Sequence, residues 1–386
     1  MKNVRWKSAP RYVSRRAPRW RRLAPFLLVA GLFLAGCRTP VAGDADGETG
    51  RETAARNRER LLKYLKAEEG KRILSGQMDT AWSDSIDMVA RVYKDTGKYP
   101  ALKGFDFINI RNPNWGGGGS KQTREAIAWW KNAPIRGKNG VVTFCWHWRM
   151  PKNGVVRGNG DTYEPGFAIP FKDGRLDRED PKFSLIQEDL DLVAAEFAAL
   201  RDAGVPLLWR PLHEASGGWF WWGANRDAYL ALWAYMYDYF TNDKGLDNLI
   251  WVWNGQKGDW YPDSDTVDVA GYDAYDDNRN KAGYIPNYNE AWRTRYIVVK
   301  AWAPDKILAL TENGAMPDPD ALIFNNAKWS YFMTWNDHGV ASGVSHKDNY
   351  WTGEWHNSDA HKKHVYNHAF VITLDELPVL STYRLE

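Results

Sequence analysis

The sequence predicts an α/β protein whose strands close into a barrel. Short apolar segments alternate with amphipathic helical segments, eight of them qualify as strands, and polar side chains follow the ends of most of these strands. Strands that are apolar on both faces and separated by helices pair in parallel, and eight such units suffice to close a sheet on itself. We therefore expect a single (β/α)8 (TIM) barrel with its functional groups at the carboxyl ends of the strands.

The composition indicates a globular protein with an unusual aromatic content. The 386 residues are 44% apolar and 26% charged, and Cys37 and Cys145 are the only thiols, which excludes coiled coils and disulfide scaffolds. The chain holds 22 Trp, 19 Tyr and 14 Phe, more rings than a core of this size needs. Such a surplus suits a ligand that is apolar on one face and covered with hydroxyl groups.

Residues 1–36 are predicted to be an export signal. Nine Lys and Arg precede an apolar run at 26–35 that is too short to cross a bilayer. The run ends in Leu34-Ala35-Gly36-Cys37, which resembles the lipobox of bacterial lipoproteins and implies a lipid on Cys37. We expect an envelope protein anchored through this lipid, with the outer membrane as its place, while the export route stays open. Residues 37–56 would be the lipidated Cys and a flexible tether, because residues 38–52 are almost free of apolar side chains.

The charge of the expected mature chain argues against nucleic acid as a partner. Residues 1–36 carry nine basic and no acidic side chains, so removing them turns the formal net charge from +3 to −6. A basic surface that attracts phosphates is therefore not predicted.

Residues 57–386 are predicted to form a single domain, since no repeat or second linker interrupts them. A helix is expected from Ser184, as N-cap with Gln187 completing a capping box, to a stop at Gly204, and a last helix within residues 359–368. The strands are expected, in order, at 73–77, 101–106, 141–146, 207–212, 249–253, 267–272, 307–311 and 331–335.

The segment 209–223, WRPLHEASGGWFWWG, places His213 and Glu214 after an apolar strand and before a run of rings. Aromatic surroundings disfavour an ionised carboxyl and raise its pKa, as a general acid requires. An ordinary ion-paired glutamate is the alternative. A zinc site of the HExxH type is excluded, because Gly217 stands where the second histidine would be.

A second carboxyl group, Glu312, follows another apolar strand in KILALTENG at residues 306–314. Strands four and seven of a barrel face each other across its mouth. Two carboxyl groups about 5 to 5.5 Å apart can hydrolyse a glycoside by double displacement, one as nucleophile and the other as acid and then base. A capping or ion-paired role for Glu312 is the alternative.

These segments resemble glycoside hydrolase family 26, whose best-known members are endo-β-1,4-mannanases. Besides residues 209–223, the resemblance rests on ILSGQ (73–77), YPALKGFD (99–106), VVTFCWHW (141–148), NLIWVWNGQ (248–256), DVAGYDAY (268–275), ILALTENG (307–314) and FMTW (332–335). It implies a (β/α)8 barrel with retaining chemistry, Glu214 as acid/base and Glu312 as nucleophile.

The resemblance also implies roles for six residues around the two glutamates. His213 matches the histidine beside the acid/base and Tyr275 the tyrosine that hydrogen-bonds the nucleophile, so that an imidazole and a phenol would both donate to Glu312. His147, Trp219 and Trp335 match groups that line the subsite of the sugar being cleaved, with Trp335 as the platform beneath it. Trp222 is expected to extend this wall, and the alternative is that its indole packs in the interior, as at least one indole of a WFWW run would.

The sequence thus predicts a retaining endo-β-1,4-mannanase that hydrolyses mannan, glucomannan or galactomannan. Family relatives acting on β-1,3-xylan or mixed-linkage β-glucan, and a surface lipoprotein that binds glycans without cutting them, are the alternatives. No cofactor and no metal are implied: Asp263, Asp265 and Asp268 lack the pattern of a calcium loop, and His361, His364 and His368 are expected on a solvated helix face. We expect a monomer.

Overall fold

The computed structural model describes residues 49–80, 87–111, 119–151, 166–275, 291–337, 349–353 and 355–385. The expected export signal, Cys37 and most of the expected tether lie outside these ranges. The chain divides into residues 1–42 and a compact unit of residues 43–386, and the fold below belongs to the second unit. None of the helices in the described ranges is long and apolar enough to cross a membrane.

Eight parallel strands close into a barrel in the order β10-β11-β2-β3-β4-β7-β8-β9. Their bounds are β2 Gly76–Met78, β3 Leu102–Asp106, β4 Val141–Cys145, β7 Leu207–Arg210, β8 Leu249–Trp253, β9 Val269–Ala274, β10 Ile307–Asn313 and β11 Phe332–Thr334. Nearly every residue of these strands is buried, because the barrel interior covers one face and the helices cover the other. The expected (β/α)8 barrel is confirmed.

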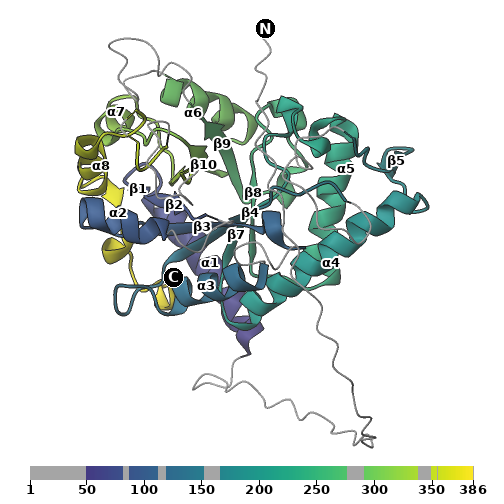
Figure 1. Cartoon of the computed structure of the whole chain (residues 1–386), viewed down its shortest axis with the longest axis horizontal. Coiled ribbons are helices and arrows are strands. Elements are labelled where there is room, and N and C mark those ends of the chain that lie inside the picture. Colours follow the sequence, from purple (N-terminus) through teal and green to yellow (C-terminus); the bar gives the residue numbers. More distant parts are fainter. Residues whose placement is uncertain are drawn as a thin grey trace, which may run out of the picture. The chain divides into compact units, whose positions relative to one another are not determined.

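Helices surround these strands in Figure 1. They are α1 Gly50–Glu68, α2 Met88–Thr96, α3 Gly119–Lys131, α4 Pro181–Asp202, α5 Arg226–Tyr237, α6 Ala291–Trp302, α7 Pro319–Phe324 and α8 Asp359–Tyr366. Short polar side chains begin several of them: the carboxylate of Asp87 accepts from the backbone of α2, the amide oxygen of Asn225 from that of α5, and the hydroxyl of Ser358 from that of α8.

The helix expected with Ser184 as its N-cap begins four residues earlier, with Asp180 as the N-cap. The carboxylate of Asp180 caps α4 by accepting from Lys182 N, and Pro181 takes the first helical position, where its missing N–H costs nothing. The hydroxyl of Ser184 instead donates back to the carbonyl of Pro181 at 2.8 Å. The acidic residue before the proline therefore decides where this helix starts.

The strand expected at 73–77 is two strands with different partners. Residues Ile73–Leu74 form β1, which pairs outside the barrel with β12 (Val371–Ile372), and only β2 joins the barrel. A small hairpin, β5 (Phe171–Lys172) and β6 (Arg175–Leu176), lies in the expected excursion after the third barrel strand. Cys145 ends β4 and is buried, and burial raises the pKa of its thiol well above the usual value.

The compact fold begins earlier than the boundary expected at residue 57. Thr49 and Glu52 form a capping box at the start of α1, and Ala54 is fully buried. This helix lies across the amino ends of the strands: Asn57 Nδ2 donates to Gly204 O at 2.8 Å, and Arg58 Nε donates to Leu249 O at 2.6 Å. Helix α1 therefore covers the end of the barrel opposite the carboxyl ends of the strands.

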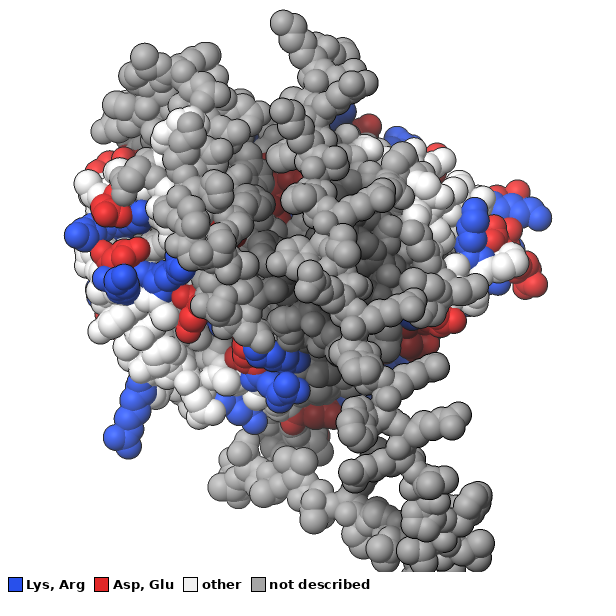
Figure 2. Space-filling model, in the orientation of Figure 1, with Lys and Arg blue, Asp and Glu red and all other residues white. Residues whose placement is uncertain are grey.

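Charged side chains of both signs lie interspersed over the described part of the face shown in Figure 2. Interspersed charges keep the local potential low, whereas an anion-binding surface gathers Lys and Arg in one region.

Candidate active site

Three carboxyl groups meet at the carboxyl ends of the barrel strands. Asp273 lies in β9, Glu312 in β10, and Glu214 follows β7. One carboxylate oxygen of each lies within 4.8 Å of the other two. Glu214 and Glu312, which are separated by almost a hundred residues of sequence, are therefore brought to the same place.

A shift in strand register aims Glu312 into the barrel. Leu310 pairs with Tyr272 and Glu312 with Asp273, so β10 has one more residue than β9 at this point. Such a bulge turns two consecutive side chains toward the same side. The hydroxyl of Thr311 accordingly donates to Asp273 Oδ1 at 2.7 Å, and the neighbouring Glu312 carboxylate still faces the site.

Two donors hold the Glu312 carboxylate. The phenol of Tyr275 donates to Oε2 at 2.7 Å, as expected. The guanidinium of Arg210 donates to Oε1 and, through its other terminal nitrogen, to Asp273 Oδ2 at 2.8 Å. Arg210 is buried, so its charge is matched by two carboxylates rather than by water.

The expected imidazole donor to Glu312 is wrong. His213 Nε2 faces His147 Nε2 at 3.3 Å, and the second donor to Glu312 is Arg210. His147 in turn is held by Asp106, the last residue of β3, whose Oδ2 lies 2.6 Å from His147 Nδ1. The result is a chain of Asp106, His147 and His213 beside the carboxyl groups.

The two histidines of this chain have opposite pKa shifts. Burial by itself lowers the pKa of His147, but the carboxylate of Asp106 outweighs burial and raises this pKa above its usual value. Burial lowers the pKa of His213 well below its usual value, and the charge of Arg210 adds to this shift. Near neutral pH His213 is therefore uncharged.

Burial and two neighbouring carboxylates keep the carboxyl group of Glu214 protonated. Its φ of 53° is in the left-handed region, which a glutamate rarely adopts, and its amide donates to Asn254 O at 3.0 Å. Burial raises the pKa of Glu214 to about 9, and the negative charges of Asp273 and Glu312 contribute. A carboxyl group with this pKa carries its proton at neutral pH.

Trp219 is the exposed aromatic group of the site. Its side chain is 47% exposed, and its indole N–H donates to Glu214 Oε2 at 3.0 Å. The ring lies against Gly217, where a Cβ atom would come within 2.1 Å of it, so glycine leaves room for the indole in this position. A ring that touches the carboxyl group and also faces solvent fits the predicted contact with a sugar.

Trp335 and Trp222 differ in how far their rings are exposed to a ligand. Trp335 follows β11, its ring centroid lies 5.4 Å from that of His147, and it keeps 8% of its surface exposed. Trp222 is fully buried and donates from Nε1 to His213 O at 2.9 Å. The expected place of Trp222 in the wall of the site is wrong, because its indole packs beneath His213. His213, at 1% exposure, is likewise too buried to contact a sugar.

Sequence analysis missed Asp106, Arg210 and Asp273. All three are charged residues inside otherwise apolar strands, in the segments KGFD, LLWR and VAGYDA. A charged side chain in a strand that is buried on both faces needs a partner in the barrel interior. That signal was available, but their partners are distant in sequence and are visible only in the structure.

The described residues offer three clusters in which a metal ligand set is conceivable. In the first, Asp106 Oδ2 lies 2.6 Å from His147 Nδ1, and burial raises the pKa of the Cys145 thiol well above its usual value. Arg210 already neutralises two of the three carboxylates in the active site. On the surface, Asp320 lies 3.1 Å from His364 Nε2 and 3.2 Å from His368 Nε2. His368 Nδ1 accepts from Phe370 N, so its Nε2 carries the proton and has no lone pair for a metal.

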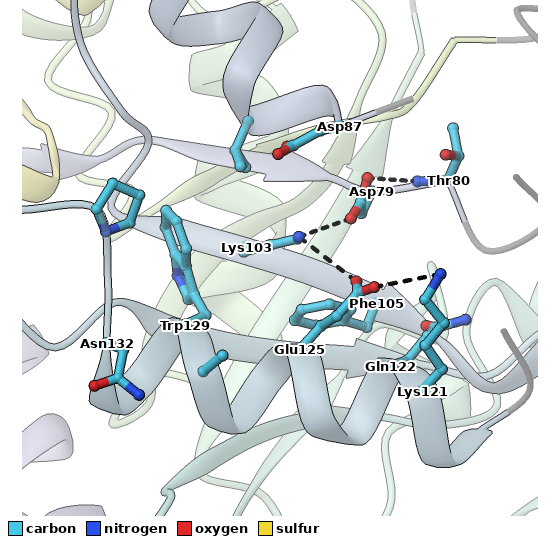
Figure 3. A pocket seen from close by; sticks show the side chains of 13 residues that line it. Asp79, Thr80, Asp87, Lys103, Phe105, Lys121, Gln122, Glu125, Trp129 and Asn132 are labelled. Carbon is cyan, nitrogen blue, oxygen red and sulfur yellow. Dashed lines mark hydrogen bonds and ion pairs between the residues drawn. The ribbon is translucent and has the colours of Figure 1, made fainter. Parts of the chain in front are cut away.

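A separate cavity of 380 Å³ lies outside the barrel, between α2 and α3. In Figure 3, Lys103 of β3 points between Asp79 and Glu125, which lie 2.8 and 3.8 Å from its ammonium group. Burial lowers the pKa of Lys103, but the charge of Asp79 outweighs it and the pKa is raised overall. None of the active-site residues lines this cavity. Its ion pairs join Lys103 of β3 to Asp79, which follows β2, and to Glu125 of α3.

Residues 51–376 match the model of glycosyl hydrolase family 26. The chain belongs to this family. It is 35% identical over 325 residues to a mannan endo-1,4-beta-mannosidase of Thermothelomyces thermophilus, covering 82% of this chain and 60% of that protein. It is 34% identical over 336 residues to mannan endo-1,4-beta-mannosidase B of a Piromyces species, covering 85% and 53%. The chain thus spans little more than half the length of these relatives.

Solved structures of family 26 enzymes have the same fold. The GH26-CBM35 beta-(1,4)-mannanase of Podospora anserina superposes with a TM-score of 0.70 at 30% identity, covering 90% of this chain and 72% of that one. A beta-mannanase from a symbiotic protist of the termite Reticulitermes speratus, solved with a gluco-manno-oligosaccharide, gives 0.66 at 29% identity, with coverage of 86% and 97%.

Proposed function

We propose that this family 26 chain is a retaining endo-β-1,4-mannanase that cleaves mannan, glucomannan or galactomannan. The observation that carries the proposal is the pairing of Glu214 and Glu312, whose nearest carboxylate oxygens lie within 4.8 Å of each other. Retaining pairs stand about 5 to 5.5 Å apart, whereas inverting pairs stand about 6.5 to 9.5 Å apart to admit a water molecule. The names of the relatives support mannan as the substrate.

In the first step, Glu312 is the nucleophile and Glu214 the general acid. A carboxylate oxygen of Glu312 forms a bond to the anomeric carbon while the glycosidic bond breaks. The leaving oxygen takes the proton of Glu214, which the raised pKa has kept in place. Tyr275 and Arg210 hold Glu312 in orientation, so the attack needs no rearrangement of its donors.

In the second step, Glu214 acts as the base. The negative charge of Glu312 is one of the causes that raise the pKa of Glu214, and this charge disappears when Glu312 becomes an ester. The pKa of Glu214 therefore falls once the glycosyl-enzyme has formed. The ionised Glu214 can then take a proton from the water that attacks the anomeric carbon, which releases the sugar with its original configuration.

The alternatives are a glycan-binding protein without activity and a hydrolase of xylan or mixed-linkage glucan. The carboxyl pair bears on the first, and the choice of substrate bears on the second. A glycan-binding protein needs aromatic side chains but not two opposed carboxyl groups, so the pair favours hydrolysis. We propose mannan over xylan and mixed-linkage glucan on the names of the relatives. We also propose that the chain acts as a monomer, and sedimentation velocity tests this.

The proposal is tested by measuring products from mannan, galactomannan, xylan and mixed-linkage glucan. The wild type should release a range of oligosaccharides from the mannans, with the β-anomer formed first in NMR spectra. Glu214→Ala and Glu312→Ala should each lose several orders of magnitude in kcat on mannan. Glu59→Ala, an exposed acidic residue of α1, is the matched control and should be unchanged. Full activity in a folded Glu312→Ala variant would overturn the proposal.

Aryl glycosides with good leaving groups separate the roles of the two glutamates. Their leaving groups need little protonation, so the first step should be partly restored in Glu214→Ala. Glu312→Ala should gain nothing, because no covalent intermediate can form. Equal rescue of both variants would contradict the assignment.

We further propose that Cys37 carries a lipid that anchors the chain in the cell envelope, in the outer membrane. The proposal rests on the sequence Leu34-Ala35-Gly36-Cys37 after a basic and then an apolar segment. Expression in a bacterial host with labelled fatty acid should label the wild type and leave Cys37→Ser unlabelled. A wild type that remains unlabelled would contradict it.

A further inference from the structure

The hydrogen bond from Tyr275 to Glu312 depends on where the Tyr275 ring lies. Among the described residues, the ring of Tyr350 lies beside it, with centroids 5.6 Å apart and planes at 46°. Tyr350 belongs to the described segment 349–353, about 75 residues away in sequence and beyond β11. No motif of the sequence pointed to it.

Gly314 provides the surface on which both rings lie. A Cβ atom at this position would come within 2.4 Å of Tyr350 Cε1 and 3.2 Å of Tyr275 Cδ1. The two rings therefore fill the space that a side chain would take, two residues after Glu312. Any movement of the Tyr350 ring leaves room into which Tyr275 can turn, away from Glu312.

The backbone of Tyr350 is fixed to the same strand end. Asn357 is fully buried, and its Nδ2 donates to Tyr350 O at 2.7 Å and to Gly314 O at 2.9 Å. Its Oδ1 accepts from Met316 N at 2.7 Å. One amide group thus connects the segment that carries Tyr350 to the segment that follows Glu312.

The neighbouring residues hold the segment from its other side. Asp337 is fully buried and accepts from Trp351 N at 2.6 Å and Thr352 N at 3.0 Å. The indole of Trp351 donates to Asp95 of α2 at 2.8 Å. His356 lies against the Tyr350 ring, with centroids 4.6 Å apart. Hydrogen bonds to the buried side chains of Asn357 and Asp337 therefore hold the backbone of the segment that carries Tyr350.

We propose that Tyr350 is a positioning residue that holds the Tyr275 phenol on Glu312 through ring packing over Gly314. The inference rests on the proposed function, since it concerns the nucleophile of that reaction. The ring of Tyr350, rather than its hydroxyl, positions the Tyr275 phenol. Replacing Tyr350 with Ala should release Tyr275, whereas replacing it with Phe should not.

The test is a double-mutant cycle on mannan with Tyr275→Phe and Tyr350→Ala. Each single variant should lower kcat roughly tenfold or more, the cost of a lost hydrogen bond to a charged group, with KM changed much less. The double variant should be little worse than Tyr275→Phe alone, because the hydrogen bond is already gone. Tyr350→Phe should keep kcat within about twofold of the wild type.

Tyr93→Ala is the matched control, because Tyr93 is a half-exposed ring of α2 that stacks on Tyr99. It should leave kcat unchanged. If Tyr350→Ala does not fold, Tyr350→Leu keeps much of the volume without the ring and takes its place in the cycle. Thermal unfolding of every variant shows whether the kinetic loss follows the loss of stability.

Three results would overturn the inference alone while the wild type cleaves mannan and Glu312→Ala does not. They are an unchanged kcat in Tyr350→Ala, costs that simply multiply in the double variant, and a loss in Tyr350→Phe as large as in Tyr350→Ala. A wild type that cleaves no glycan would overturn the proposed function and this inference together.

Discussion

The indole N–H of Trp219 donates to Oε2 of Glu214 across 3.0 Å, although the indole itself is half exposed. The bond links the proposed acid to a ring that a substrate would touch. It also works against the other influences on Glu214: burial, Asp273 and Glu312 raise the pKa of Glu214, whereas this bond lowers it. Substitutions of Trp219, Asp273 and Glu214 test these influences, and a fourth prediction concerns the ion pair of Lys103.

Trp219→Phe removes the indole N–H and keeps an aromatic ring. Because the bond favours the ionised carboxyl group, its loss should raise the pKa of Glu214 further. The alkaline limb of the kcat/KM profile should therefore move to higher pH, and KM should rise as the platform shrinks. A profile measured from pH 5 to 10 on soluble mannan checks this. A limb that moves to lower pH would show that the bond does not favour the ionised form.

Asp273→Asn removes a negative charge next to Glu214. Asp273 follows burial as the next cause that raises the pKa of Glu214, so the alkaline limb should move to lower pH. Arg210 loses one of its two carboxylates, and kcat should fall roughly ten- to a hundredfold as its hold on Glu312 changes. Asp227→Asn on α5, an exposed residue, is the control. An unmoved limb would contradict the electrostatic coupling.

Glu214→Gln should stabilise the fold in a way that depends on pH. The pKa of Glu214 is raised in the folded state to about 9, so the folded state binds a proton that the unfolded state releases above about pH 4.3. The wild type therefore loses stability as pH rises from the unfolded value toward the folded one. The melting temperature of Glu214→Gln should equal that of the wild type near pH 4 and exceed it at pH 7 to 8. A constant difference across this range would argue against the raised pKa.

The ion pair in Figure 3 should matter for stability rather than for activity. Asp79→Ala removes the nearer carboxylate from the buried ammonium of Lys103 and leaves Glu125 at 3.8 Å, and we expect a loss of about 3 kcal/mol in unfolding free energy. Lys103→Met with Asp79→Ala should recover much of this loss, because no unpaired charge remains. Denaturant unfolding measures both. Their kcat on mannan should stay near that of the wild type, and a large loss of kcat in Lys103→Met would connect this cavity to catalysis.

The presence of the strands was predictable, because a strand that is buried on both faces is a continuous apolar run in the sequence. Each of the eight expected segments overlaps a barrel strand, since an apolar run of four to six residues between helical patterns is typical of a buried strand. The split of residues 73–77 was not predictable, because all five residues are buried whichever strand they pair with. The start of α4 differs from the expected one because Asp180 caps the helix and Pro181 fits its first position, ahead of Ser184.

The two glutamates of the candidate site were predictable from the sequence, but the hydrogen bonds that hold them were not. Glu214 and Glu312 each follow an apolar strand, and the structure brings them together as expected. His213 was expected to donate to Glu312, but it faces His147, and Arg210 makes that bond. Trp222 is one of four aromatic residues in succession, and sequence order does not say which of them faces solvent.

The chain's own pattern of apolar runs and helix caps determined the barrel and the two glutamates at its rim, because both follow from residues near one another in sequence. The tertiary structure alone decided that Arg210 spans Asp273 and Glu312, and that Tyr350 lies on Gly314 beside Tyr275. Those contacts depend on strand register, on one bulge in β10 and on which side chains share the interior. Barrel closure sets all three at once, and no local stretch of sequence contains that information.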